Sequence, residues 1–231
     1  MCGRFGLKTT FSTLARLLRA EPVDDVEWGP DFNIAPTDPA PVLLSEGGVP
    51  RLRLFRWGLV PFWADDPRVG VRMINARGDT IATKPAFRES FEKRRLLVPA
   101  HGWYEWVHAP PALSKTEKPQ PFWLHQGEHL LMFAGVWSRW RDRQGQPLDT
   151  FAIATTDASP GTRAVHDRMP VVLDPEAQAL WLDPETPRAE LEALLVPYAG
   201  PIDVHAVAKT VNNVRADGPE LILPIAGADR P

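Results

Sequence analysis

The residue with the most distinctive chemistry in this chain is its only cysteine, Cys2. Removal of Met1, which is usual when the second residue is small, would leave Cys2 with an α-amine and a thiol on adjacent carbons. Both groups are partly deprotonated at neutral pH, because their reference pKa values are about 7.7–8.0 and about 8.5. Such an aminothiol condenses with an aldehyde to an imine, and the thiol then closes a thiazolidine ring. The alternative interpretation is an inert residue at a frayed terminus.

Four short patterns elsewhere combine a polar side chain with apolar or constrained neighbours. Asn75 and Arg77 stand two residues apart at the end of an expected strand and therefore share a face. Glu105 lies among large aromatic residues, an environment that raises the pKa of a carboxyl toward values useful for acid–base catalysis. His166 precedes a buried-looking strand, and Asn33 places an amide inside an expected loop. Ordinary structural roles are the alternatives: a strand-end hydrogen bond, a paired or exposed carboxylate, and a core imidazole.

The sequence argues against a bound metal or cofactor. One cysteine allows no intramolecular disulfide, no multi-cysteine zinc site and no iron–sulfur cluster. His125 and His129 would need a helix to share a metal, whereas Gly127 between two expected strands predicts a hairpin turn. Neither a glycine-rich phosphate loop nor the G-x-S-x-G motif occurs. We therefore expect no metal and no cofactor.

Length and composition favour one folded domain. The 231 residues are 44% hydrophobic and carry a formal net charge of −3, which argues against wholesale disorder. The longest apolar run, Leu130 to Trp137, is too short to cross a bilayer, and no apolar signal region follows Met1. We expect a single domain over residues 1–231, with its core at about 2–225. We also expect a monomeric, cytoplasmic protein without a membrane partner.

The charge is distributed unevenly along the chain. Residues 51–100 contain eleven Lys or Arg and five Asp or Glu, a balance of +6, whereas the remainder contains fifteen and twenty-four, a balance of −9. Such asymmetry can mark an electropositive face that binds nucleic acid. Arginines that are merely solvated strand and loop positions are the alternative.

Short strand-forming runs bounded by proline and glycine dominate the chain. We expect strands at residues 41–44, 51–57, 71–75, 95–100, 103–107, 121–125, 130–137, 150–156, 170–173 and 202–208. The run of prolines at 109–121 predicts an exposed loop between two of them. No alternation of strands and helices occurs, so we predict an α+β fold with a mainly antiparallel, barrel-like sheet and a few peripheral helices.

Three helices have recognisable starts. Thr10 can cap a short amphipathic helix that begins at Phe11. Asp174 and Thr186 are each followed by proline, the combination typical of an N-cap and the first helical position. The elements that must hold the candidate residues in place are therefore mostly strands.

Taken together, the motifs resemble those of the SRAP family of abasic-site processing proteins. The resemblance extends from Cys2 to about Ile225 and rests on motifs in this order: MCGRF, FNIAP at 32–36, RWGLVPFW at 56–63, INAR at 74–77, GWYEW at 102–106, FAGVW at 133–137 and HDRMPVVL at 166–173. It implies one α+β domain with a DNA-binding channel. It also implies covalent capture of abasic sites in single-stranded DNA, in the context of DNA damage and the SOS response.

The resemblance assigns a role to four residues of the reaction. Cys2 supplies the amine and the thiol, and Asn75 orients this N-terminal residue near the sugar. Glu105 moves protons during imine formation and ring closure. His166 protonates the sugar ring oxygen and so favours the open-chain aldehyde. The imine stage also allows β-elimination, so a weak strand-cleaving lyase activity is expected.

The resemblance also assigns a DNA-binding surface. Arg4 and Arg77 match phosphate-contacting arginines, and Asn33 in FNIAP is expected beside them. Phe62 and Trp63 match a wedge that blocks a continuing duplex, since exposed rings beside arginines can stack on bases. One departure is visible after NAR, where Asp79 replaces the longer glutamate that is usual in the family.

Two other functions use the same residues differently. A self-processing peptidase of the N-terminal-nucleophile kind would use Cys2, Asn75 and Glu105 on a peptide bond. A noncatalytic reader of single-stranded or modified DNA would leave Cys2 inert. Substitution of Cys2 separates the three, because only a crosslinking protein would lose a covalent DNA adduct.

Overall fold

The computed structural model of the chain describes residues 2–24, 26–107 and 119–225. Met1 and most of the expected loop at 109–121 lie outside these residues. The end of that loop is described, and it already belongs to strand β9, which begins at Gln120.

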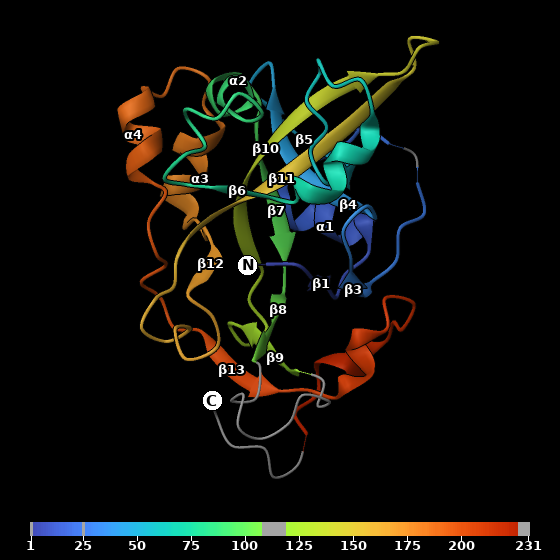
Figure 1. The fold of residues 1–231 in the computed structure, drawn as a ribbon, viewed down its shortest axis with the longest axis vertical. Helices are drawn as coiled ribbons and strands as arrows, with labels where there is room; N and C mark the ends of the chain where they lie inside the picture. Colours follow the sequence, from blue (N-terminus) through green and yellow to red (C-terminus); the bar gives the residue numbers. More distant parts are fainter. Residues whose placement is uncertain (1, 25, 108–118, 226–231) are drawn as a thin grey trace.

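Five long strands form a closed barrel (Figure 1). They are β4 (Pro39–Glu46), β5 (Val49–Trp57), β7 (Arg95–Ala100), β10 (Leu131–Arg141) and β11 (Pro147–Asp157). Neighbouring strands pair antiparallel in the order β5-β4-β7-β10-β11, and a parallel pairing of β11 with β5 closes the ring. Their apolar residues fill the interior. The predicted barrel-like, mainly antiparallel α+β fold is confirmed, whereas the single domain stays a prediction.

Three short strands extend the barrel at its rim. β2 (Glu21–Pro22) pairs parallel with β5, β6 (Asn75–Arg77) pairs parallel with β11, and β12 (Arg168–Pro170) pairs antiparallel with β11. β6 and β12 therefore lie beside the same strand, so the residues of the INAR and HDRMP motifs are brought close together.

A second sheet contains five strands in the order β13-β9-β8-β1-β3. Their ranges are Asp203–Ala206, Gln120–His125, Gly102–Val107, Phe5–Leu7 and Asp31–Ile34. Only His101 separates β7 of the barrel from β8 of this sheet, so the chain passes directly from one sheet into the other. The start of the described chain lies between the two sheets (Figure 1).

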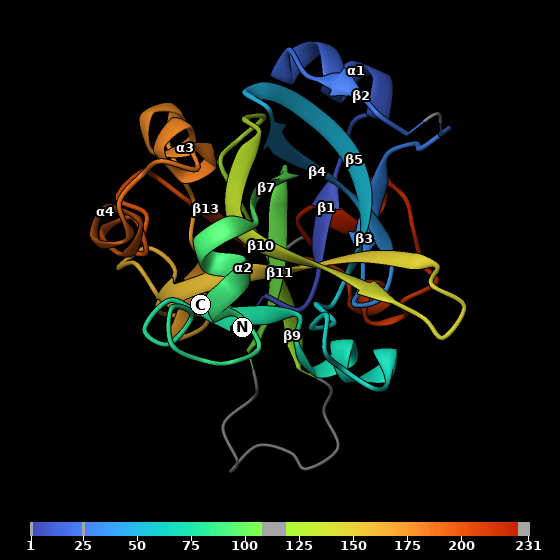
Figure 2. The same cartoon turned by 90° about the horizontal axis from the view of Figure 1, so that it is seen from above.

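The helices are short and peripheral, as expected (Figure 2). The α-helices are α1 (Phe11–Leu18), α2 (Arg88–Lys93), α3 (Pro175–Leu182) and α4 (Arg188–Ala193). Three 3₁₀ helices, η1 (Pro67–Arg72), η2 (Lys209–Asn212) and η3 (Pro219–Ile222), complete the described elements.

Two of the three predicted helix caps are confirmed. The hydroxyl of Thr10 accepts a hydrogen bond from the backbone N–H of Thr13, and the carboxylate of Asp174 accepts one from Ala177. The prediction for Thr186 is wrong, because Pro187 occupies the N-cap position of α4 without a side-chain cap. The hydroxyl of Thr186 instead donates to the carbonyl of Leu180 in the preceding helix.

Two predicted strands differ from the structure. Residues 71–75 do not form one strand, because η1 ends at Arg72 and the pairing with β11 starts only at Asn75. The strand expected at 170–173 ends at Pro170, after which Val172 makes an isolated bridge to Phe133. The predicted turn around Gly127 is confirmed by its positive φ of 54°. The prediction of a hairpin is wrong, because the strands that this turn joins, β9 and β10, belong to two different sheets.

Candidate functional site

Strand pairing places Cys2 beside the end of β8. Phe5 on β1 lies opposite Trp103, and the backbone N–H of Tyr104 donates to the carbonyl of Arg4 at 2.9 Å. Cys2 lies two residues before Arg4 and close enough to β8 for the charge of Glu105, the residue after Tyr104, to act on its thiol. The side chain of Cys2 is fully buried, so the predicted nucleophile belongs to the interior and is not a frayed terminus.

Asn75 is held against Cys2. Its Nδ2 donates a hydrogen bond of 2.7 Å to the carbonyl oxygen of Cys2. The residue before it is fixed from the core, because the indole of the buried Trp57 donates to the carbonyl of Ile74 at 2.9 Å. The buried Oδ1 of Asn75 has no hydrogen-bond partner among the described residues. This oxygen can therefore accept a hydrogen bond from an amine or hydroxyl brought into the site.

Glu105 has the environment that the sequence predicts. Only 3% of the residue is exposed, and burial raises the pKa of its carboxyl from 4.5 to about 7. Burial also raises the pKa of the Cys2 thiol, and the charge of Glu105 raises it further. The thiol is therefore protonated at neutral pH, while Glu105 titrates near neutrality and can both accept and donate a proton.

His166 lies on the connection between β11 and β12, and internal hydrogen bonds hold this connection in place. The backbone N–H of His166 donates to the carbonyl of Thr162 at 3.2 Å. Thr162 is itself buried, and its hydroxyl lies 3.8 Å from the sulfur of Met169. The same sulfur accepts the backbone N–H of Ser159 at 3.3 Å. The buried Met169 of the HDRMP motif thus anchors the segment that carries the histidine.

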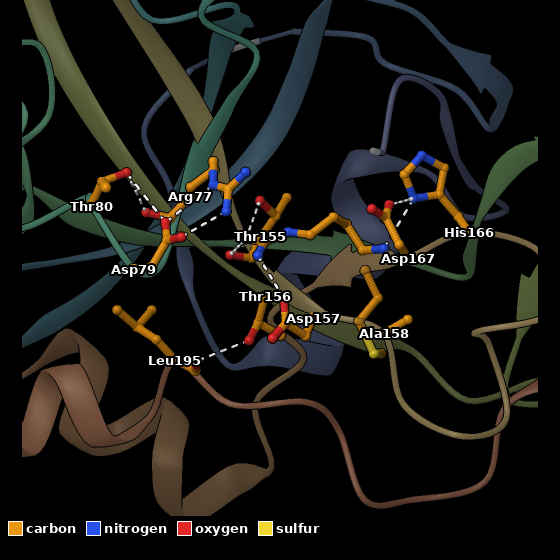
Figure 3. A network of polar contacts seen from close by, with 12 residues as sticks. Arg77, Asp79, Thr80, Thr155, Thr156, Asp157, Ala158, His166, Asp167 and Leu195 are labelled. Carbon is orange, nitrogen blue, oxygen red and sulfur yellow. Dashed lines mark hydrogen bonds and ion pairs between the residues drawn. The ribbon is translucent and has the colours of Figure 1, made fainter.

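The ring of His166 has two possible partners for Nδ1. This nitrogen lies 3.0 Å from the backbone N–H of Arg168 and 2.7 Å from the carboxylate of Asp167 (Figure 3). Burial lowers the pKa of His166, so the neutral ring predominates at pH 7, accepts from Arg168 and carries its proton on Nε2. The protonated ring can instead donate to Asp167, which also lies close enough for its charge to raise the pKa of Glu105.

Arg77 lies on β6 next to this region and is exposed over about half of its side chain. Its guanidinium donates twice to Asp79, from Nε at 3.1 Å and from a terminal nitrogen at 2.7 Å. The shorter side chain of Asp79 therefore still forms a close pair with Arg77. On β12, Arg168 donates to Asp157 at 2.8 Å and to the carbonyl of Thr155 at 2.7 Å.

Phe62 and Trp63 are 53% and 55% exposed, as a surface wedge requires. They belong to the segment 58–73, in which Gly58 and Gly70 lie close together. A Cβ on Gly70 would lie 2.5 Å from the carbonyl oxygen of Gly58, so this approach requires glycine. The indole of Trp140 also donates to the carbonyl of Ala64 at 2.6 Å. The rings therefore project from a well-anchored segment.

Arg4 and Asn33 lie in the interior, which sequence patterns did not indicate for Arg4. A terminal nitrogen of Arg4 donates to Oδ1 of Asn33 at 2.6 Å and to the carbonyl of Val211 at 3.1 Å. The amide nitrogen of Asn33 donates to the carbonyls of Asn213 and Ala216 at 3.1 and 2.7 Å. Both side chains thus attach the C-terminal segment to β1 and β3, and their DNA contact stays a prediction.

Part of the positive charge of residues 51–100 is balanced within the fold, at five of the eleven basic residues. Carboxylates lie within ion-pair distance of Arg51, Arg53, Arg68, Arg77 and Arg94. Arg95 does not fit the alternative of solvated arginines, because it is buried and donates to four backbone carbonyls at the ends of α2 and α3. An excess of charge in the sequence therefore does not translate directly into an electropositive face.

Metal binding and membrane crossing find no support in the part of the chain that the structure describes. Within residues 2–24, 26–107 and 119–225, no group of three or more His, Cys, Asp or Glu is placed to hold a metal ion. His125 and His205 approach each other edge to face at 5.1 Å, but no third ligand joins them in these ranges. No helix among the described residues is both long and apolar enough to cross a membrane.

Comparison with known proteins agrees with the motifs. Residues 1–214 match the family described as SOS response associated peptidase (SRAP). The abasic site processing protein YoqW of Bacillus subtilis is 36% identical over 96% of this chain and 99% of its own length. The abasic site processing protein YedK of Escherichia coli is 30% identical, covering 97% of this chain and all of its own length. The abasic site processing protein HMCES of Gallus gallus is 33% identical over 97% of this chain and 78% of its own length.

Solved structures show the same fold. The crystal structure of a protein from Bacteroides thetaiotaomicron superposes with a TM-score of 0.84 at 25% identity, over 97% of this chain and all of that protein. The barrel and the second sheet define a protein of α+β architecture, with a buried cysteine as its candidate functional residue. The chain belongs to the SRAP family.

Sequence reasoning gave no separate role to several residues around this site. Asp157, Asp167 and Arg168 form polar contacts beside the candidate residues, and Thr162 and Met169 hold the histidine-bearing connection. Three of them lie inside the HDRMP motif, which was the available signal. The other two depend on the pairing of β11 with β12, which the sequence alone does not specify.

Proposed function

We propose that this protein, after removal of Met1, captures abasic sites in single-stranded DNA as a covalent thiazolidine adduct of Cys2. The observation that carries the proposal is the burial of Cys2 beside a carboxyl whose pKa is raised to about 7, Glu105, with Asn75 bonded to the Cys2 carbonyl. The names of the similar proteins YoqW, YedK and HMCES support the substrate class.

The first step opens the sugar. An abasic deoxyribose is mostly a closed hemiacetal, whose ring C–O bond must break to give an aldehyde. His166 in its protonated form donates a proton to the ring oxygen, while the anomeric hydroxyl loses its proton to solvent. Asp167, whose carboxylate lies 2.7 Å from Nδ1, stabilises the imidazolium that this step requires.

The second step joins the amine to the aldehyde. The neutral α-amine of Cys2 attacks the aldehyde carbon, and the resulting carbinolamine loses water to form an imine. A carboxyl that titrates near neutrality suits this step, because Glu105 can protonate the leaving hydroxyl and then recover the proton. Asn75 keeps the N-terminal residue in place by its bond to the Cys2 carbonyl.

The third step closes the ring. The Cys2 thiol transfers its proton by way of Glu105 to the imine nitrogen, and the sulfur forms a bond to the imine carbon. The net reaction of aldehyde and aminothiol releases one water and leaves a saturated five-membered ring. Because the imine is consumed, the adduct outlasts a reversible Schiff base, and β-elimination from the imine remains a minor lyase reaction.

We infer the DNA contacts from the exposure of the side chains. Arg77 is an exposed arginine two residues after Asn75 on β6, and Phe62 and Trp63 offer exposed rings that can stack on bases or block a duplex. Arg4 and Asn33 support the site from within, since their side chains are bonded to the C-terminal segment. We propose that the protein carries out this reaction as a monomer, without metal or cofactor.

A denaturing gel tests the proposal. Mature protein is mixed with a single-stranded oligonucleotide that carries one abasic site, beside an undamaged oligonucleotide and the Cys2→Ala variant. A shifted band only with wild type and the abasic strand supports covalent capture through Cys2. Noncovalent binding that Cys2→Ala retains, with no shifted band in either form, would identify a reader of DNA. Cleavage of a peptide substrate without a DNA adduct would identify a peptidase.

A further inference from the structure

Three basic side chains beside the site each lie within ion-pair distance of a carboxylate. We call these six residues the paired rim: Arg77 with Asp79, Arg168 with Asp157, and His166 with Asp167. Figure 3 shows Arg77 beside Asp79 and His166 beside Asp167. The six residues come from β6 and the turn after it, from the end of β11, and from β12 with its preceding connection, so the pairs lie on or next to adjacent strands. This arrangement is unexpected for a surface that must receive a polyanion.

Arg77 is the most exposed of the three basic side chains, at 51% against 10% for Arg168 and 30% for His166. Nε and a terminal nitrogen of Arg77 donate to the two carboxylate oxygens at 3.1 and 2.7 Å, the fork geometry that a phosphate would otherwise occupy. The two side chains are both 51% exposed. A phosphate that binds this face of Arg77 therefore has to displace Asp79.

The other two carboxylates add to the same effect. Asp157 and Asp167 are 73% and 83% exposed at their side chains. The charges of both act on Arg77, in addition to the direct pair with Asp79. With His166 neutral, the rim holds two positive and three negative charges, so its net charge is −1 and it repels a distant phosphate chain.

We propose that Asp79, assisted by Asp157 and Asp167, competes with DNA phosphate for Arg77 and thereby limits the affinity of the protein for undamaged single-stranded DNA. The inference rests on the proposed function and deepens it. Retention at a lesion then depends on the covalent bond, while undamaged strands are released. The competition sets selectivity without any contact to a base.

The expected change in DNA affinity follows from the exposure of the Arg77–Asp79 pair. Exposed ion pairs contribute little free energy, so phosphate can displace Asp79, and removing its charge should tighten binding by about two- to five-fold. The triple variant Asp79→Asn, Asp157→Asn and Asp167→Asn should bind more tightly than Asp79→Asn alone, because the charges of all three carboxylates act on Arg77. The logarithmic salt dependence of binding should steepen by about one counterion when Arg77 is freed for phosphate.

The test is fluorescence anisotropy of a labelled undamaged single-stranded oligonucleotide with the full chain. Asp79→Asn is the decisive variant, because its pair is exposed and its loss leaves no buried charge. Glu21→Gln is the matched control, since Glu21 also pairs with an arginine at the surface, Arg51, and lies on β2 at the opposite end of the sheet order. Thermal unfolding verifies that each variant is folded.

The expected result is tighter binding and a steeper salt dependence for Asp79→Asn, with no change for Glu21→Gln. Unchanged or weaker binding by Asp79→Asn would overturn the proposal, as would an equal gain from Glu21→Gln. A parallel reaction with an abasic oligonucleotide keeps the two proposals apart. Absence of a covalent product from wild type would refute covalent capture, whereas the anisotropy difference reports on the competition alone.

Discussion

Replacement of Glu105 by glutamine should stabilise the folded protein at alkaline pH while it slows the reaction. Only 3% of Glu105 is exposed, and burial raises the pKa of its carboxyl from 4.5 to about 7. Between pH 4.5 and about 7, the folded protein keeps the Glu105 proton that the unfolded chain has lost. The free energy of unfolding therefore falls as pH rises through this window, and the full destabilisation by the ionised Glu105 is present above pH 7.

The magnitude follows from linkage. A carboxyl with these folded and unfolded pKa values costs about 3 kcal/mol of stability when fully ionised, of which about 2–3 kcal/mol develops between about pH 5 and about pH 8. Glutamine has nearly the same volume and no charge. The difference in unfolding free energy between Glu105→Gln and wild type should thus increase by about 2–3 kcal/mol, in favour of the variant, over that range.

Urea unfolding at the two pH values measures this difference directly. Glu128→Gln is the control, because the salt bridge to Lys8 lowers the pKa of that exposed carboxyl and gives a small effect of opposite sign. A difference between Glu105→Gln and wild type that does not change with pH would refute the argument. The adduct-forming rate of Glu105→Gln should fall about a hundred-fold or more if the carboxyl moves protons.

Three further variants test how the site is held. Gly70→Ala should cost about 1–3 kcal/mol in urea unfolding, because its Cβ would lie 2.5 Å from the carbonyl of Gly58. Asn33→Ala should cost about 2–4 kcal/mol in the same measurement, since it removes a hydrogen-bond acceptor from buried Arg4 and a donor from the carbonyls of Asn213 and Ala216. If His166 acts as proposed, Thr162→Val should slow adduct formation several-fold in a single-turnover assay without changing affinity for undamaged DNA, because the loop that carries the His166 imidazole loses its contact with the sulfur of Met169.

For each of these three predictions, a specific outcome would contradict the reasoning. Gly29→Ala, at a position with nothing within 4 Å of the added Cβ, is the control for Gly70→Ala, and equal stabilities would contradict the close-approach argument. An Asn33→Ala protein as stable as wild type would show that the C-terminal segment is held by other contacts. Thr162→Val with an unchanged rate would remove Thr162 from the positioning of the imidazole.

Much of the fold could be predicted because local signals agreed with tertiary structure. Thr10 and Asp174 cap helices as their sequence patterns indicate. The run at 95–100 forms β7 within its predicted bounds. The strand predicted at 71–75 is wrong. The β-branched and apolar residues of this run favour a strand locally, whereas the proline at 67 and the close approach at Gly70 impose a 3₁₀ turn.

The site residues were recognisable by type but not by partner. Aromatic neighbours predicted the raised pKa of Glu105, which the structure confirms. The bond between Asn75 and the Cys2 carbonyl joins positions 73 residues apart, so no local pattern could specify it. The burial of Arg4 depends on the C-terminal segment, which lies 207 residues further along the chain at Val211.

The most direct test of covalent capture is the intact mass of the adduct. Mature protein that has lost Met1 is incubated with a single-stranded abasic oligonucleotide, and the product is weighed with and without prior borohydride treatment. Covalent capture through Cys2 predicts a mass equal to protein plus oligonucleotide less one water, unchanged by borohydride because the ring is saturated, with the bond at Cys2. No adduct from protein that lacks Met1, or an equally stable adduct that Cys2→Ala forms without borohydride, would contradict covalent capture through Cys2.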